Sequence, residues 1–328
     1  MNFMERRPIH DDNVKFFGGN SDTFEKSSKV RARVIAQSLA GLIKNSSHVL
    51  VMGHKNSDLD SFGASLGVAK IAIAYGKKAN IVVDFESIEK KTKDVATMIK
   101  NHDKYKGMII SYTEAMEHIN KNTLLIVVDN HKPSLAISNA LLERVRNKVI
   151  IDHHRRGEEF IEAPVLTYLE PAASSTVELV VELCDYQNVE LNINELDATI
   201  MYAGMLVDTN NFKQRVGVRT FQSAAYLKEL QANMTLAYEF LEDSYEETLQ
   251  RLSITQTAYR YNPCLLYTSD VYKRQRLCYM QDWHSINLEK NWIWIKAGLC
   301  HHQIYLNKFK YCLIMDIKVI VCLIIHLY

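Results

Sequence analysis

The octapeptide HKNSDLDS (residues 54–61) decides how the rest of the chain is interpreted. It follows the apolar run 48–53, which is typical of a buried strand, so its polar side chains lie where that strand gives way to a loop. One histidine and two aspartates fall within seven positions, at His54, Asp58 and Asp60. This crowding is typical either of a metal site or of an Asp-rich capping turn, and the octapeptide alone leaves both open.

Six apolar runs of strand length recur along the chain, and helical patterns separate them. The predicted strands are residues 48–53, 79–84, 107–111, 123–129, 148–152 and 165–170. The predicted helices include residues 23–45, 61–76, 133–145, 175–187, 194–208, 219–232 and 234–252. This alternation predicts an α/β fold, in which a parallel sheet carries helices on both faces and is followed by further helices. Ligands bind such sheets beyond the carboxyl ends of the strands.

The first predicted helix has an apolar stripe at helical spacing. Its members are Val30, Val34, Ile35, Leu39, Leu42 and Ile43. The spacing predicts an amphipathic helix whose buried face carries these six side chains.

Polar groups after the later predicted elements repeat the chemistry of the first turn. They are Asp129 and His131 after one strand, the triplet Asp152, His153 and His154 after the next, and Asp208 at the end of a helix. Taken singly, each group is also typical of a helix cap or a solvated loop. Their recurrence at consecutive strand ends favours one common site. Carboxylates and imidazoles together suit divalent ions such as Mn²⁺, and two such ions could support hydrolysis of a phosphate ester.

The composition of the chain changes near residue 260. The 328 residues carry a formal net charge of +1, which does not indicate binding to duplex nucleic acid or to a membrane surface. From Arg260 onward there are nine basic residues against four acidic ones, five of the six cysteines and all three tryptophans. The preceding body has Cys184 alone, which is typical of a reducing compartment.

Five segments resemble the successive motifs of the DHH phosphoesterase superfamily, and within it the bacterial cyclic-di-AMP phosphodiesterases of the GdpP type. The segments are GHKNSDLDSFGAS (53–65), IVVDNHKPS (126–134), IIDHHRRGEEF (150–160), EPAASSTVELV (170–180) and GMLVDTNNFKQRVGVRTF (204–221). The resemblance extends from about residue 14 to residue 257. It implies a dinuclear manganese centre and hydrolysis of a phosphodiester.

The resemblance also implies a role for each candidate ligand. His54 and Asp58 would hold one Mn²⁺ ion, whereas the other would be held by Asp60, His153 and Asp208. Asp129 would bridge the two ions. Beside the metals, Asp152 would orient an imidazole, and His154 would face the phosphate as a hydrogen-bond donor or acid. His131 is a weaker candidate for the phosphate side.

Two interpretations, one structural and one functional, are open for each of Ser175, Arg215 and Arg219. Ser175 and Glu178 are spaced as a capping box that begins a helix, but helix N-termini also attract phosphate, and the family uses this loop near its substrate. Arg215 and Arg219 flank the segment after Asp208 and could each meet a phosphate, although a solvated arginine is the commoner outcome.

The resemblance predicts four segments. Residues 1–22 would be the remnant of a degenerate GGDEF-like domain, 23–46 a linker helix and 47–257 the DHH phosphoesterase domain. Residues 258–328 are expected to be a non-native tail, because the peptide PCLLYTSDVYKRQ (263–275) resembles a translated sequencing adapter. The family's DHH-associated substrate domain would then be missing, which predicts little turnover of the cyclic dinucleotide by this chain.

The expected function is manganese-dependent hydrolysis of cyclic di-AMP to linear pApA. The alternatives are an oligoribonuclease or nucleotide phosphatase of the same superfamily, or a catalytically impaired nucleotide-binding module. The expected partner is a cyclic dinucleotide, and a homodimer is allowed. The parent enzyme would lie on the cytoplasmic side of the cell membrane, held by N-terminal helices that this chain lacks.

Overall fold

The computed structural model describes residues 25–243 and 245–261, which fall into two compact units that divide between Glu242 and Asp243. The second unit contributes one described helix, α10 (Tyr245–Tyr261), so the predicted boundary at residue 257 lies inside a helix. The predicted remnant 1–22 and the tail from residue 262 lie outside the described residues. Among the helices described, none is both long and apolar enough to cross a membrane.

The first unit is built on a six-stranded sheet in which every pairing is parallel. Its strands are β1 (His48–Met52), β2 (Ala79–Val82), β3 (Ile109–Ile110), β4 (Thr123–Val128), β5 (Asn147–Asp152) and β6 (Leu166–Leu169). All six predicted strands are therefore confirmed. The order β3-β2-β1-β4-β5-β6 reverses direction between β1 and β4, and the crevice beyond such a switch point is where open α/β sheets bind ligands.

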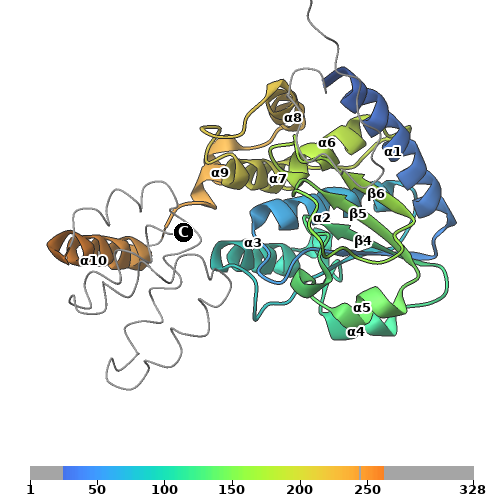
Figure 1. The fold of residues 1–328 in the computed structure, drawn as a ribbon, viewed down its shortest axis with the longest axis horizontal. Coiled ribbons are helices and arrows are strands. Elements are labelled where there is room, and N and C mark those ends of the chain that lie inside the picture. Colours follow the sequence, from blue (N-terminus) through green and yellow to red (C-terminus); the bar gives the residue numbers. More distant parts are fainter. Residues whose placement is uncertain (1–24, 244, 262–328) are drawn as a thin grey trace, which may run out of the picture. The chain divides into compact units, whose positions relative to one another are not determined.

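Helices cover both faces of the sheet, which confirms the predicted fold class (Figure 1). The helices of the first unit are α1 (Glu25–Asn45), α2 (Leu59–Ala74), α3 (Lys90–Asn101), α4 (Tyr112–Glu117), α5 (Asn139–Arg144), α6 (Thr176–Asp185), α7 (Glu195–Asp208), α8 (Val218–Glu229) and α9 (Met234–Glu239). Short 3₁₀ turns occupy Asp103–Tyr105 and Pro133–Leu135. The helices α1, α2 and α6 contribute to the core on one face, whereas α4 and α5 cover the other.

The predicted buried stripe of α1 is wrong in its first half. Val30 and Val34 are 67% and 55% exposed. The buried side chains of this helix are Ala32, Ala36, Leu39, Ala40 and Ile43. The buried stripe that contains Leu39 and Ile43 continues at helical spacing to Ala36 and Ala32. The prediction chose the valines because they are more hydrophobic than alanine.

Two predicted helices are each divided by a break. Residues 133–145 form a 3₁₀ turn and the short helix α5, because Ser138 begins a new helix by accepting the backbone N–H of Leu141. Between these two parts, Ala136 is extended and pairs with His54 in an isolated bridge. Residues 234–252 divide in the same way between α9 and α10.

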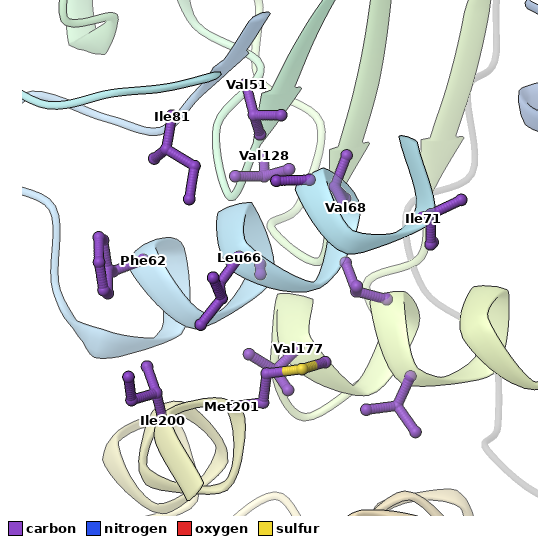
Figure 2. Packing of buried hydrophobic residues seen from close by; sticks show 14 of the residues in the cluster. Val51, Phe62, Leu66, Val68, Ile71, Ile81, Val128, Val177, Ile200 and Met201 are labelled. Carbon is purple, nitrogen blue, oxygen red and sulfur yellow. The ribbon is translucent and has the colours of Figure 1, made fainter. Parts of the chain in front are cut away.

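Helix α2 is buried against the sheet on one side and against α6 and α7 on the other. Figure 2 shows Leu66 and Phe62 of this helix above Ile200 and Met201 of α7, with strand residues on the far side. The close approach depends on glycines. A Cβ at Gly204 would lie 2.6 Å from the carbonyl oxygen of Leu59 and 3.0 Å from the Cα of Asp60. The contact brings the C-terminal half of α7 against the first turn of α2.

Replacing Gly204 with alanine should therefore destabilise the protein by about 1–3 kcal/mol, because the new methyl group meets backbone that cannot turn aside. Chemical denaturation with the matched variant Gly41→Ala measures this. Gly41 lies within α1 with open space around its Cβ position, so alanine there should stabilise by about 0.5–1 kcal/mol. Equal stability of the Gly204→Ala variant and the unchanged protein would contradict the packing argument.

Candidate metal centre

The first loop of the site runs from β1 to α2 and fixes two side chains. Asp58 is the N-cap of α2, where its Oδ1 accepts the backbone N–H groups of Asp60 and Ser61, each at 3.0 Å. His54 is held against the segment before α5 by its bridge to Ala136. The His54 Nε2 lies 3.9 Å from the Asp58 Oδ1. Asp58 therefore caps the helix, and the same carboxylate also faces His54.

Asp129 lies at the carboxyl end of β4 and is shared by two histidines. Its Oδ2 is 3.4 Å from the His54 Nε2, and its Oδ1 is 3.4 Å from the His153 Nε2. The backbone φ of Asp129 is +56°, in the left-handed region that non-glycine residues seldom adopt. Strained backbone of this kind is concentrated at functional sites, where the surrounding structure holds it in place.

A second group of side chains lies on the other side of Asp129. The His153 Nε2 is 3.0 Å from the Asp208 Oδ2 at the C-terminal end of α7. Asp60 completes this group and is fully buried. His54, Asp58, Asp60, Asp129, His153 and Asp208 together are called the candidate centre below. The sequence separates these residues by more than 150 positions, and the fold brings all six together.

The candidate centre has the donor set of a divalent cation site. Two groups, His54 with Asp58 and Asp129, and Asp60 with His153 and Asp208, each place three ligand atoms within 4.8 Å of one another. The buried Nε2 of His153 has no hydrogen bond of acceptable geometry despite its acidic neighbours. An imidazole nitrogen left without a hydrogen bond among carboxylate oxygens is what a metal ligand requires, and the O/N set suits Mn²⁺ or a similar ion.

Burial and the nearby negative charges disfavour the ionised form of two carboxylates of the candidate centre. Burial, together with the charges of Asp129 and Asp208, raises the pKa of Asp58 to about 7 and holds that of Asp60 well above its ordinary value. Burial lowers the pKa of His54, but its bond to Asp129 and the nearby carboxylates outweigh this and raise it to about 9. A bound cation would favour the ionised carboxylates that these surroundings disfavour.

Asp152 is hydrogen-bonded to two histidines next to the candidate centre. Its Oδ1 contacts the His154 Nδ1 at 2.8 Å and accepts the His154 backbone N–H at 3.0 Å. Its Oδ2 contacts the His131 Nδ1 at 2.5 Å. Burial raises the pKa of Asp152, but these two histidine bonds dominate and lower it to about 2. These bonds restrict the orientation of both imidazoles, and the role of Asp152 beside bound metals stays a prediction.

The two histidines on Asp152 have different surroundings. The His154 side chain is 55% exposed, and its Nδ1 is also 3.5 Å from the Asp129 Oδ1. His131 is only 1% exposed, and its Nε2 accepts the backbone N–H of Gly157 at 3.3 Å. Both ring nitrogens of His131 are thus engaged inside the protein, which does not favour the predicted contact with a phosphate.

The remaining substrate candidates separate clearly. Ser175 is fully buried, and its Oγ accepts the Glu178 backbone N–H at 3.1 Å, which is the capping reading. Arg219 is 7% exposed and forms two bonds of 2.7 Å to the Glu182 carboxylate, a geometry that favours a structural role. Arg215 is exposed, and its backbone lies in the left-handed region with a φ of +55°. Its side chain has no hydrogen bond or ion pair within the described part of the chain.

Sequence reasoning missed the residue between Ser175 and Val177. Thr176 is fully buried and donates from its Oγ1 to the Asp129 Oδ1 at 2.9 Å. Its backbone N–H donates to the Asp60 Oδ2 at 2.7 Å. The only signal in the sequence was its place in the first turn of a predicted helix, which says nothing about the partner of its hydroxyl.

Comparison with known proteins shows that residues 48–205 match the model of the DHH family, N-terminal domain. The chain is 44% identical over 243 residues to the cyclic-di-AMP phosphodiesterase GdpP of Bacillus subtilis. It is 41% identical over 244 residues to the cyclic-di-AMP phosphodiesterase PdeA of Listeria monocytogenes. In both cases the match covers 74% of this chain and 37% of the relative.

A solved structure supports the fold independently. An exopolyphosphatase-related protein from Bacteroides fragilis superposes with a TM-score of 0.55 over 67% of this chain and 63% of its own, at 20% sequence identity. At that identity the likeness concerns the fold alone.

Binding of Mn²⁺ should release protons, because Asp58 and His54 must lose theirs before they can act as ligands. Both groups have raised pKa values, so they are partly or fully protonated at neutral pH and the affinity falls as the pH falls. We expect the affinity to rise from about pH 6 to about pH 8, by roughly tenfold per pH unit for each proton released. Calorimetry in buffers of different ionisation enthalpy counts the protons. Affinity that does not change with pH would contradict the electrostatics described.

Proposed function

The chain contains a DHH-family domain homologous to those of cyclic-di-AMP phosphodiesterases, and from this premise we propose that it is the catalytic part of a manganese-dependent phosphodiesterase that hydrolyses cyclic di-AMP to pApA. The observation that carries the proposal is the carboxylate of Asp129, whose Oδ2 lies 3.4 Å from the His54 Nε2 and whose Oδ1 lies 3.4 Å from the His153 Nε2, so that it faces one histidine of each group. A phosphoesterase of this kind needs two cations close together, and a shared carboxylate is the simplest way to keep them there.

The proposed ligand assignment follows the two groups. His54 and Asp58 would hold one Mn²⁺ ion, and Asp60, His153 and Asp208 would hold the other, with Asp129 between them. When bound, the ions would activate a water molecule and neutralise charge on the phosphate. Asp129 would contribute one oxygen to each side, since its Oδ2 faces His54 and its Oδ1 faces His153.

His154 is the proposed acid on the phosphate side. Its Nδ1 is engaged by Asp152, so the ring is held in one orientation with the Nε2 left for a substrate oxygen. The bond to Asp152 raises the pKa of His154, which favours the protonated form that can donate to the oxygen leaving phosphorus. Water would add to phosphorus, the P–O bond to that oxygen would break, and His154 would supply its proton.

The substrate assignment depends on relatives of greater length. The chain spans 37% of the length of the GdpP and PdeA proteins it matches, so cyclic di-AMP, a homodimer and attachment of the parent protein to the cytoplasmic side of a membrane are proposals taken from the resemblance. The runner-up activities act on the same phosphate chemistry with other leaving groups. Only measured rates separate them.

The direct test uses the full chain with Mn²⁺ and three substrates: cyclic di-AMP, a short oligoribonucleotide and a nucleoside bisphosphate. Chromatography of the products measures each rate, with bis(p-nitrophenyl) phosphate as a small activated diester. We expect manganese-dependent hydrolysis of the small activated diester and little turnover of cyclic di-AMP, with pApA as its product. Faster release of phosphate from the bisphosphate would favour a nucleotide phosphatase. Absence of any manganese-dependent hydrolysis would favour the nucleotide-binding module.

Loss of Asp129 should be the most damaging single change to metal binding, because its carboxylate faces a histidine of each group. Asp129→Ala should abolish tight binding of both ions, as measured by elemental analysis after gel filtration with Mn²⁺. Asp185→Ala, at the far end of α6, serves as a matched control for the loss of an aspartate. A normal manganese content in the Asp129→Ala variant would exclude the bridging role.

His154→Ala should keep both ions and slow turnover by about 10²–10⁴-fold, since it removes a proton donor. The control is His102→Ala, an exposed histidine that no contact links to the candidate centre. Elemental analysis and the diester assay on the same preparations separate metal content from rate. Loss of an ion in the His154→Ala variant would instead make this histidine a ligand, which its position 3.5 Å from the Asp129 Oδ1 allows.

A further inference from the structure

The first turn of α6 presents three hydrogen-bond donors to two carboxylates of the candidate centre. The backbone N–H groups of Thr176 and Val177 donate to the Asp60 Oδ2 at 2.7 Å and to its Oδ1 at 3.0 Å. The Thr176 Oγ1 donates to the Asp129 Oδ1 at 2.9 Å. Any residue except proline could supply the backbone donors, but only serine or threonine could place a hydroxyl at this position of the turn.

The hydroxyl of Thr176 selects one oxygen of Asp129. The hydroxyl is the donor in this bond, and the carboxylate oxygen accepts. The Oδ1 that it contacts is the oxygen nearest His153, whereas the Oδ2 faces His54. The bond therefore fixes the rotation of the carboxylate that sends one oxygen to each group.

The turn that carries Thr176 is itself anchored. Ser175 caps it, and the Glu178 carboxylate accepts the hydroxyls of Ser174 at 2.6 Å and of Thr220 on α8 at 2.7 Å. Val177 packs against α2 and α7, and Figure 2 shows its side chain beside Met201 of α7. A donor on a turn held from both sides has little freedom to move away from its acceptor.

We propose that Thr176 is a positioning residue that acts through Asp129 and sets the geometry in which this carboxylate bridges two ions. The proposal rests on the proposed function, because it assumes that the candidate centre binds divalent metal. Partners that orient a ligand in this way commonly change metal affinity by about 10–100-fold when they are removed. The Oδ1 side of Asp129, with Asp60, His153 and Asp208, should lose more affinity than the side of His54 and Asp58.

The competing explanation is that Thr176 is only a satisfied core residue. In that case its hydroxyl would contribute to folding stability and leave the ions unaffected. Metal affinity separates the two explanations, because a purely structural bond would change the unfolding temperature of the metal-free protein and leave Mn²⁺ binding unchanged.

The experiment titrates the full chain with Mn²⁺ and measures the free ion by electron paramagnetic resonance. Thr176→Val keeps the shape and removes the donor, whereas Thr176→Ser keeps the donor. The matched control is Thr199→Val, which removes another buried hydroxyl; this one donates to the Glu195 carbonyl oxygen and accepts the Asn233 backbone N–H. Thermal unfolding of each metal-free variant is measured alongside.

The proposal predicts that Thr176→Val weakens binding of at least one ion by about 10–100-fold, and that Thr176→Ser and Thr199→Val stay within a few-fold of the unchanged protein. If the valine variant does not fold, Thr176→Ala against Thr176→Ser makes the same comparison. Binding by Thr176→Val equal to that of the unchanged protein overturns the positioning role and leaves the proposed function intact. Failure of the unchanged protein to bind Mn²⁺ overturns both.

Discussion

The candidate centre must accommodate the mutual repulsion of four carboxylates, of which those of Asp60 and Asp129 are buried and those of Asp58 and Asp208 are partly exposed. Two features of the protein reduce this repulsion. The histidines His54 and His153 lie between the acids, and the first turns of α2 and α6 direct backbone N–H groups at Asp58 and Asp60. Cations bound between the carboxylates would reduce the repulsion further.

The fold explains how acids so far apart in sequence meet. The order of the sheet puts β1 beside β4 and β4 beside β5, so the loops that carry His54, Asp129 and His153 leave from adjacent strands. Helix α7 then has to bring Asp208 to the same place from the opposite side. It can do so because Gly204 lets its backbone approach the first turn of α2. The close packing of α7 on α2 in the core therefore also places Asp208 in the candidate centre.

The sequence was sufficient for the sheet and for the gathering of the candidate ligands that follow its strands, because strand-end position in a parallel sheet determines both. Asp208, at the end of a helix, was assigned by resemblance to the family. The sequence was insufficient wherever a side chain had a choice of partners. Three assignments made by residue type illustrate this. Tertiary packing leaves Val30 and Val34 of α1 exposed. It buries His131 and pairs Arg219 with Glu182. Thr176 escaped notice for the same reason, since nothing local indicates that its hydroxyl meets Asp129.

The central claim is that Asp129 bridges two ions, and anomalous scattering from crystals grown with Mn²⁺ tests it most directly. Our account predicts two manganese peaks roughly 3.5–4 Å apart, one on each side of the Asp129 carboxylate. One peak should lie beside His54 and Asp58, and the other beside Asp60, His153 and Asp208. A single peak, or two peaks that do not share Asp129, would contradict it.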